Sequence, residues 1–96
     1  MSNTNTTNNK SGIAIHVGEF LKEAFIEPLG LSLEEAAYRC GTTESTLSRL
    51  INKKSNLTPE LAVKLEKGFG RTAESWMNIQ TLYLIHQVKK SNGDSH

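Results

Sequence analysis

The sequence predicts an all-α fold, a five-helix bundle that contains a helix-turn-helix. Apolar residues recur at spacings of three and four along most of the chain, which is the period of a helix that packs on one side. A small residue, a glycine and a leucine stand at the spacing that a helix-turn-helix needs: Ala37, Gly41 and Leu47. The 96 residues, 36% of them hydrophobic, suffice for one core and are too few for a second. We therefore expect one helical domain.

The first residues are dominated by Asn, Thr and Ser, with too little apolar surface to offset the entropy of ordering. We expect a disordered polar tail over residues 1–14, a folded domain over residues 15–90 and a disordered C-terminal tail over residues 91–96. The N-terminal tail is either a solubilising extension or a segment that folds on a partner.

The first helix is expected to start at His16, which caps the helix or packs near its start. Pro28 and Gly30 stop this helix. Its expected apolar stripe consists of Val17, Phe20, Leu21, Ala24 and Phe25.

The predicted helix-turn-helix has clear boundary residues. Ser32 and Glu35 form a capping box at the start of its first helix, and Gly41 ends that helix in a left-handed conformation. Thr42 or Thr43 caps the second helix. The second helix turns three apolar residues inward and five polar residues largely outward: Leu47, Leu50 and Ile51, and Glu44, Ser45, Thr46, Ser48 and Arg49. An ordinary helical hairpin is the alternative.

The fourth helix starts with Thr58 as N-cap and Pro59 in the first helical position, and it ends at Gly70. Its expected buried stripe is Leu61, Ala62, Leu65 and Phe69.

The last helix is expected to begin at Thr72 and to run to Lys89 or Lys90, and its apolar residues surround the axis almost completely. Such a helix is normally covered on more than one side, which a domain of this size cannot do alone. We expect a homodimer through Leu82, Leu84, Ile85 and Val88, whereas a more deeply embedded helix is the alternative. A two-fold dimer of a helix-turn-helix protein presents the second helix of each motif to one of two DNA half-sites, which lie roughly 34 Å apart.

Charge is distributed unevenly along the chain. Residues 1–38 contain two basic and five acidic residues, whereas residues 39–71 contain seven basic and three acidic residues. The positive charge thus follows the predicted DNA-reading unit, where it can contact phosphates. A merely solvated charged face is the alternative.

The residue types that most often form catalytic or metal-binding sites show no recognised spacing in this sequence. The single Cys40 lies in the apolar pattern of its helix and is expected to be buried. The three histidines and Cys40 lack metal-ligand spacing, and no phosphate loop or nucleophile motif occurs. We therefore expect no enzyme, metal or cofactor. No run of 18 apolar residues and no signal-peptide pattern occurs, so we expect a cytoplasmic, nucleoid-associated protein without a membrane partner.

Five segments occur in an order that resembles a known family: HVGE at 16–19, PLGLS at 28–32, STLSRL at 45–50, LTPE at 57–60 and WMNIQ at 76–80. The chain resembles a HigA-type antitoxin of the Xre/Cro (lambda-repressor-like) helix-turn-helix superfamily over about residues 15–88. The resemblance implies a dimer that binds and represses the promoter of its own operon. It also implies a partner, a HigB-type toxin, which is an mRNA-cleaving ribonuclease neutralised by complex formation.

Three positions depart from the family pattern. Val17 replaces the usual proline, and Thr42 stands where a valine or isoleucine is usual. Lys53 occupies a turn position that glycine often holds, so Asn52 is expected to adopt the left-handed conformation instead.

The helix from about Thr43 to Asn52 is expected to enter the major groove of DNA. Arg49 contacts either a guanine or a phosphate, since its planar fork suits both. Lys53 and Lys54 are expected to contact phosphates. The predicted DNA-binding residues are Thr43, Glu44, Ser45, Thr46, Ser48, Arg49, Asn52, Lys53 and Lys54.

A second role is protein binding, because the acidic part of the chain would complement a basic ribonuclease surface. The alternative function is a stand-alone, phage-like repressor with the same fold and no toxin partner.

Overall fold

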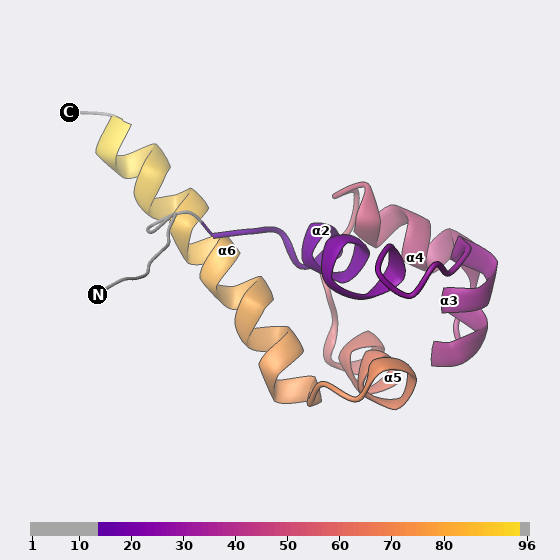
Figure 1. The fold of residues 1–96 in the computed structure, drawn as a ribbon. Helices are drawn as coiled ribbons and strands as arrows, with labels where there is room; N and C mark the ends of the chain where they lie inside the picture. Colours follow the sequence, from indigo (N-terminus) through magenta and orange to yellow (C-terminus); the bar gives the residue numbers. More distant parts are fainter. Residues whose placement is uncertain (1–13, 95–96) are drawn as a thin grey trace, which may run out of the picture.

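The computed structural model describes residues 14–94, which fold entirely from helices. The first helix consists of α2 (Val17–Leu21) and a π-helical continuation, η1 (Lys22–Ile26). It is followed by α3 (Leu33–Cys40), α4 (Glu44–Ile51), α5 (Pro59–Phe69) and α6 (Ala73–Asp94). With α2 and η1 counted as one helix, the described part has five helices and no strand, which confirms the predicted all-α class (Figure 1).

The start of the first helix is fixed by His16. Its Nδ1 atom accepts a hydrogen bond from the backbone N–H of Gly18 at 2.9 Å, as expected of an N-cap. The imidazole is buried and meets the ring of Tyr83 from α6 edge to face, with ring centroids 4.9 Å apart. His16 therefore caps one helix and packs against another.

Because of the π-helical turn, the apolar stripe of the first helix differs from the expected one. The N–H of Glu27 donates to the carbonyl of Lys22, five residues back, at 2.9 Å. This wider turn changes which side chains face the core. Ala24, expected in the stripe, is exposed, and Ile26 is buried in its place.

Both helices of the helix-turn-helix have the predicted caps. Ser32 Oγ accepts from the N–H of Glu35 at 3.0 Å, and the Glu35 carboxylate accepts from the N–H of Ser32 at 2.8 Å. Gly41 has φ 72° and ends α3. Of the two candidate threonines, Thr43 caps α4 by accepting from the N–H of Thr46 at 3.1 Å. Gly41 and Thr43 together set the turn between α3 and α4.

Helix α5 packs on α3 through a small residue that the sequence pattern did not single out. Gly68 is buried, and a Cβ atom there would lie 2.5 Å from Sγ of Cys40. Cys40 is buried, as expected, and burial raises the pKa of its thiol to about 11. At neutral pH the thiol is therefore protonated and serves packing.

The core centres on Trp76 of α6, which is fully buried. Its ring lies 5.8 Å from that of Phe20 and 5.4 Å from that of Phe25, and Phe25 lies 5.4 Å from Phe69. Such aromatic pairs add to the free energy gained by burial alone. The aromatic residues thus join the first, fourth and last helices.

Helix α6 begins after Thr72, whose Oγ1 accepts from the N–H of Ser75 at 3.1 Å. It runs to Asp94, beyond the expected end at Lys89 or Lys90. Residues 91–94 of the expected C-terminal tail are therefore helical. Residues 1–13 of the expected N-terminal tail and residues 95–96 lie outside the described residues.

The C-terminal half of α6 extends away from the other helices (Figure 1). The four apolar residues expected at a dimer interface are 41% to 60% exposed on it: Leu82, Leu84, Ile85 and Val88. Within residues 14–94, no helix combines the length and the apolarity needed to cross a lipid bilayer.

Candidate nucleic-acid interface

Helix α4 packs in the core with one side and exposes a polar face on the other. Leu47 and Leu50 have no exposed surface, which anchors the helix in the core. The opposite side is open to solvent, since Glu44, Ser45 and Arg49 are exposed and Thr46 and Ser48 are partly exposed. The predicted reading residues thus share one face of one helix.

Hydrogen bonds at both ends of α4 orient part of this face. Thr43 Oγ1 donates to Thr46 Oγ1 at 2.8 Å. Asn52 Nδ2 donates to the carbonyl of Ser48 at 2.9 Å and to its Oγ at 3.3 Å. The predicted contact residues near the two helix ends are therefore held in place by neighbours on the same helix.

The expectation that Asn52 adopts the left-handed conformation after α4 is wrong. Lys53 has φ 62°, whereas Asn52 has φ −89° and is not left-handed. The N–H of Lys54 donates to the carbonyl of Arg49 at 2.8 Å, and the N–H of Lys53 donates to that of Leu50 at 3.1 Å. This pair of bonds is the Schellman motif, which places the left-handed residue at position 53 whatever its side chain.

Lys53 is also paired within the protein. Its Nζ atom lies 3.3 Å from Oε1 of Glu19 on α2. Both side chains are partly exposed, so this pair contributes little to the free energy of folding. The ammonium group lies at the end of α4, where a DNA phosphate could compete for it.

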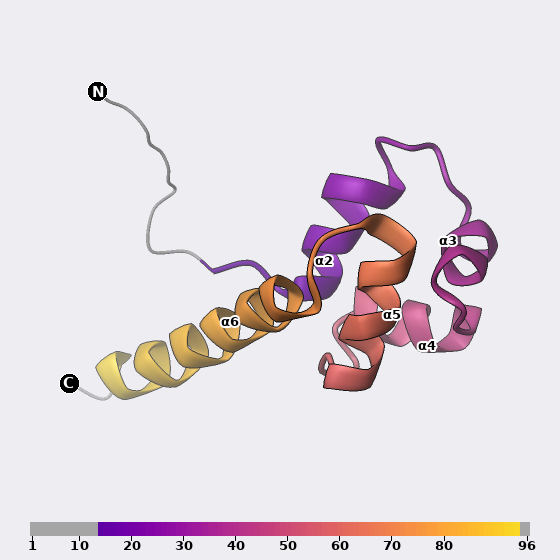
Figure 2. The same ribbon diagram turned by 90° about the horizontal axis from the view of Figure 1, so that it is seen from below.

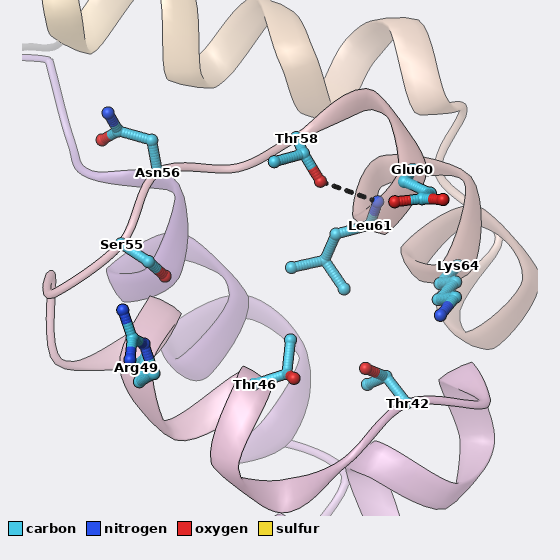
Figure 3. A pocket seen from close by; sticks show the side chains of 9 residues that line it. All are labelled: Thr42, Thr46, Arg49, Ser55, Asn56, Thr58, Glu60, Leu61 and Lys64. Carbon is cyan, nitrogen blue, oxygen red and sulfur yellow. Dashed lines mark hydrogen bonds between the residues drawn. The ribbon is translucent and has the colours of Figure 1, made fainter.

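A hollow of about 340 Å³ lies between α4 and the start of α5 (Figure 3). In Figure 3, Arg49 of α4 lies next to Ser55, and Lys64 of α5 lies across from Thr42. Most of the lining residues are polar, and they come from the turn before α4, from α4, from the following loop and from α5: Thr42, Thr46, Arg49, Ser55, Asn56, Thr58, Glu60, Leu61 and Lys64. The hollow extends the polar surface of α4 onto the next helix.

Six polar residues of this hollow were not predicted as site residues, among them Ser55, Asn56 and Lys64. Ser55 and Asn56 follow the lysine pair in the sequence, so continuing the basic and polar run would have found them. Lys64 lies on a helix that the sequence assigned to the core, and only the packing of α5 beside α4 reveals it.

Two arginines of the basic segment lie against aromatic rings of the protein. Arg39 donates from Nε to the carbonyl of Gly68 at 3.1 Å, and its guanidinium lies 5.2 Å from the centre of the Phe69 ring. Arg71 lies over Phe20, at 5.1 Å. These two arginines serve packing. The cations on or beside α4 are Arg49, Lys53, Lys54 and Lys64.

The first helix supports α4 through a glycine. A Cβ atom at Gly18 would overlap the carbonyl of Leu50 in the last turn of α4. Only a residue without a side chain permits this approach of two backbones. The orientation of α4 therefore depends on α2, which lies outside the two-helix motif.

A capped helix with an exposed polar face and adjacent cations can enter the major groove, where side chains reach base edges and cations meet phosphates. Within residues 14–94, no three or more His, Cys, Asp or Glu side chains are grouped so that they could hold a metal ion. The fold and this surface define a helix-turn-helix DNA-binding regulator.

The chain belongs to the helix-turn-helix family, in its Xre type, since the family described as Helix-turn-helix matches residues 21–76. It is 45% identical over 65 residues to an uncharacterized HTH-type transcriptional regulator of Haemophilus influenzae, a match that covers 68% of this chain and 61% of that protein. It is 42% identical over 66 residues to antitoxin HigA-1 of Vibrio cholerae, covering 69% and 62% of the two chains. The matches thus span less than two thirds of both relatives.

A solved structure, Pseudomonas aeruginosa antitoxin HigA with the higBA promoter, superposes with a TM-score of 0.76 at 25% identity. The superposition covers 84% of this chain and 88% of that chain. The relatives and the structural neighbours thus include HigA antitoxins, as the five-segment resemblance implied.

Proposed function

We propose that this protein binds operator DNA upstream of its own operon and represses that operon. The observation that carries the proposal is the exposed polar face of α4, which has four cations on or beside it. The HigA structure with its promoter supports the same use of the fold. The proposal places the predicted reading residues at base edges and Lys53, Lys54 and Thr43 at phosphates. It also places the protein on the nucleoid in the cytoplasm.

Binding to a labelled duplex from the upstream region tests this proposal. We expect tight binding that weakens steeply as salt rises, because phosphate contacts release counterions. A scrambled duplex of the same composition should bind far more weakly. Equal affinity for both duplexes would contradict operator recognition.

The proposed DNA-binding form is a two-fold dimer through α6. Leu84 and Val88 lie four residues apart on one side of the exposed half of this helix. An isolated helical extension is marginal in water, so a second copy that covers these residues would stabilise it. Light scattering tests the dimer: Val88→Glu should yield monomers, whereas Gln87→Glu, the same added charge on the neighbouring residue, should not.

We further propose that the protein is the antitoxin of a type II pair and neutralises a HigB-type mRNA-cleaving ribonuclease. The relative named antitoxin HigA-1 supports this role. The test is growth of a host that expresses the adjacent reading frame alone and then together with this protein. Arrest alone with rescue on co-expression is the expected result.

The second candidate is a stand-alone repressor, which the relative named only as a transcriptional regulator favours. The same growth experiment separates the two functions. Normal growth with a neighbouring product that is shown to be expressed would favour the repressor without a toxin.

A further inference from the structure

Helix α3 presents a large aromatic side chain to solvent. Tyr38 is 87% exposed, the highest exposure among the large hydrophobic residues that face solvent in the described part. The buried residues of this helix, Ala36, Ala37 and Cys40, lie on its other side. At 100° per residue, Tyr38 is near the centre of the outward face, so it adds almost nothing to the core. A tyrosine in this position suits a contact with another molecule.

Tyr38 borders a shallow hollow of about 430 Å³ with a mainly apolar surface. We call this surface the α3 patch, and it consists of Leu31, Glu34, Glu35, Tyr38 and Arg39. Glu34 and Glu35 are exposed, four and three residues before Tyr38, and thus next to it on the helix. The α3 patch therefore combines an aromatic ring with two carboxylates.

The α3 patch has a net negative charge, because it contains two acidic residues, Glu34 and Glu35, and one basic residue, the exposed Arg39. The Arg39 guanidinium is turned to the carbonyl of Gly68 and the ring of Phe69. The hydrogen bonds from Ser32 to the carboxylate lower the pKa of Glu35, so this group stays ionised while it caps α3. A partner would thus meet negative charge and an apolar hollow together.

The α3 patch lies away from the two surfaces already assigned. Figure 2 shows α3 at the end of the molecule opposite the free half of α6. None of its residues lines the hollow beside Arg49. A chain that uses α4 for DNA and α6 for a second copy therefore keeps the α3 patch available.

We propose that the α3 patch docks on the RNA-binding surface of the ribonuclease toxin, an inference that rests on the proposed antitoxin function. An enzyme that cleaves mRNA needs cations for phosphates, and single-stranded bases commonly stack on flat side chains. The carboxylates of Glu34 and Glu35 match the negative charge of a nucleotide's phosphate, and the ring of Tyr38 matches its flat base. Docking here blocks the substrate from its binding surface.

Inhibition of RNA cleavage by the product of the adjacent reading frame, made by cell-free translation, tests this inference. The readout is the concentration of this protein that halves cleavage of a fluorescent RNA. Tyr38→Arg and Glu34→Lys should each raise it at least about tenfold, because a central aromatic or charged contact often dominates an interface. The control Glu23→Lys makes the same charge change on η1, outside the α3 patch, and should raise it less than about twofold.

The outcomes separate the two hypotheses. If the unmodified protein does not inhibit cleavage, the antitoxin function falls and this inference falls with it. If it inhibits and Tyr38→Arg inhibits equally well, only the docking surface is wrong. An equal loss in Glu23→Lys would show that overall acidity matters instead. A changed molecular mass of Tyr38→Arg in light scattering would assign the patch to self-association and also overturn the inference. Unchanged thermal unfolding midpoints establish that the variants are folded.

Discussion

The Nζ atom of Lys53 lies 3.3 Å from Oε1 of Glu19, so an ion pair joins the turn after α4 to the first helix. The same lysine is predicted to contact a DNA phosphate. The carboxylate of Glu19 and a phosphate therefore compete for one cation. If Lys53 contacts a phosphate as proposed, we expect operator affinity to depend on Glu19 as well.

Glu19→Gln should raise operator affinity, because it frees the Lys53 ammonium for a phosphate. The expected gain is up to about fivefold, the range of one exposed ion pair. Fluorescence anisotropy with a labelled operator measures it. Glu23→Gln removes the same charge from η1 and should change the affinity much less. Equal gains in both variants would point to overall charge and not to the pair.

Lys53→Gly and Lys53→Ala should lose the same operator affinity but differ in stability. Both remove the cation, whereas only glycine relieves the left-handed conformation at φ 62°. Because that conformation costs a residue with a Cβ atom about 1 kcal/mol, the glycine variant should be more stable than the alanine variant by about that amount. Urea unfolding measures the difference. Equal stabilities would mean that the turn relaxes in solution.

Arg49→Ala should weaken operator binding by about 1–3 kcal/mol without lowering the unfolding temperature, since the side chain is exposed. Lys54→Ala should weaken operator and scrambled duplex alike and reduce the salt slope by about one. Titrations of both duplexes at several salt concentrations compare the two variants. If Arg49→Ala also weakens both duplexes equally, Arg49 contacts a phosphate and not a base.

Stability should fall as the pH drops below about 6.5, the usual pKa of histidine. Burial, and then the Lys53 cation, lower the pKa of His16 in the folded protein. The unfolded chain therefore binds a proton that the folded state rejects, and acid favours unfolding by at most about 1.4 kcal/mol per pH unit. Urea unfolding between pH 7.5 and 5.5 measures this slope.

His16→Asn keeps an oxygen that can cap the helix and removes the titrating group, so it should flatten the slope. His86→Asn changes a partly exposed histidine of α6 in the same way and should keep it. A slope that survives in His16→Asn would assign the pH dependence to another group.

Features set by neighbouring residues were predictable from the sequence. The capping box of Ser32 and Glu35, the glycine end of α3 and the Thr43 cap each depend on residues within one turn. These features place α4 and its polar face correctly. Local chemistry was therefore enough to predict where the two helices of the helix-turn-helix begin and where the first one ends.

Features set by distant residues were not predictable. The π-helical turn moves Ile26 into the core, although the spacing of apolar residues favoured Ala24. Gln80 is a polar residue of the last helix, yet it is buried and its Oε1 accepts from the N–H of Leu57 at 3.2 Å. The contribution of Lys64 to the hollow likewise depends on how α5 packs beside α4. Each depends on a packing partner that the local pattern does not reveal.

The close contact of Gly18 with the carbonyl of Leu50 affects which piece of this chain can be transplanted. The segment shared with the family starts at residue 21, after that glycine, and ends at residue 76, before Gln80. A fragment cut at those limits would keep both helices of the motif. It would lose Gly18, which packs against α4, and Gln80, which accepts a hydrogen bond from Leu57 in the following loop. Chimaeras that exchange operator specificity between relatives therefore need to carry the flanking residues as well.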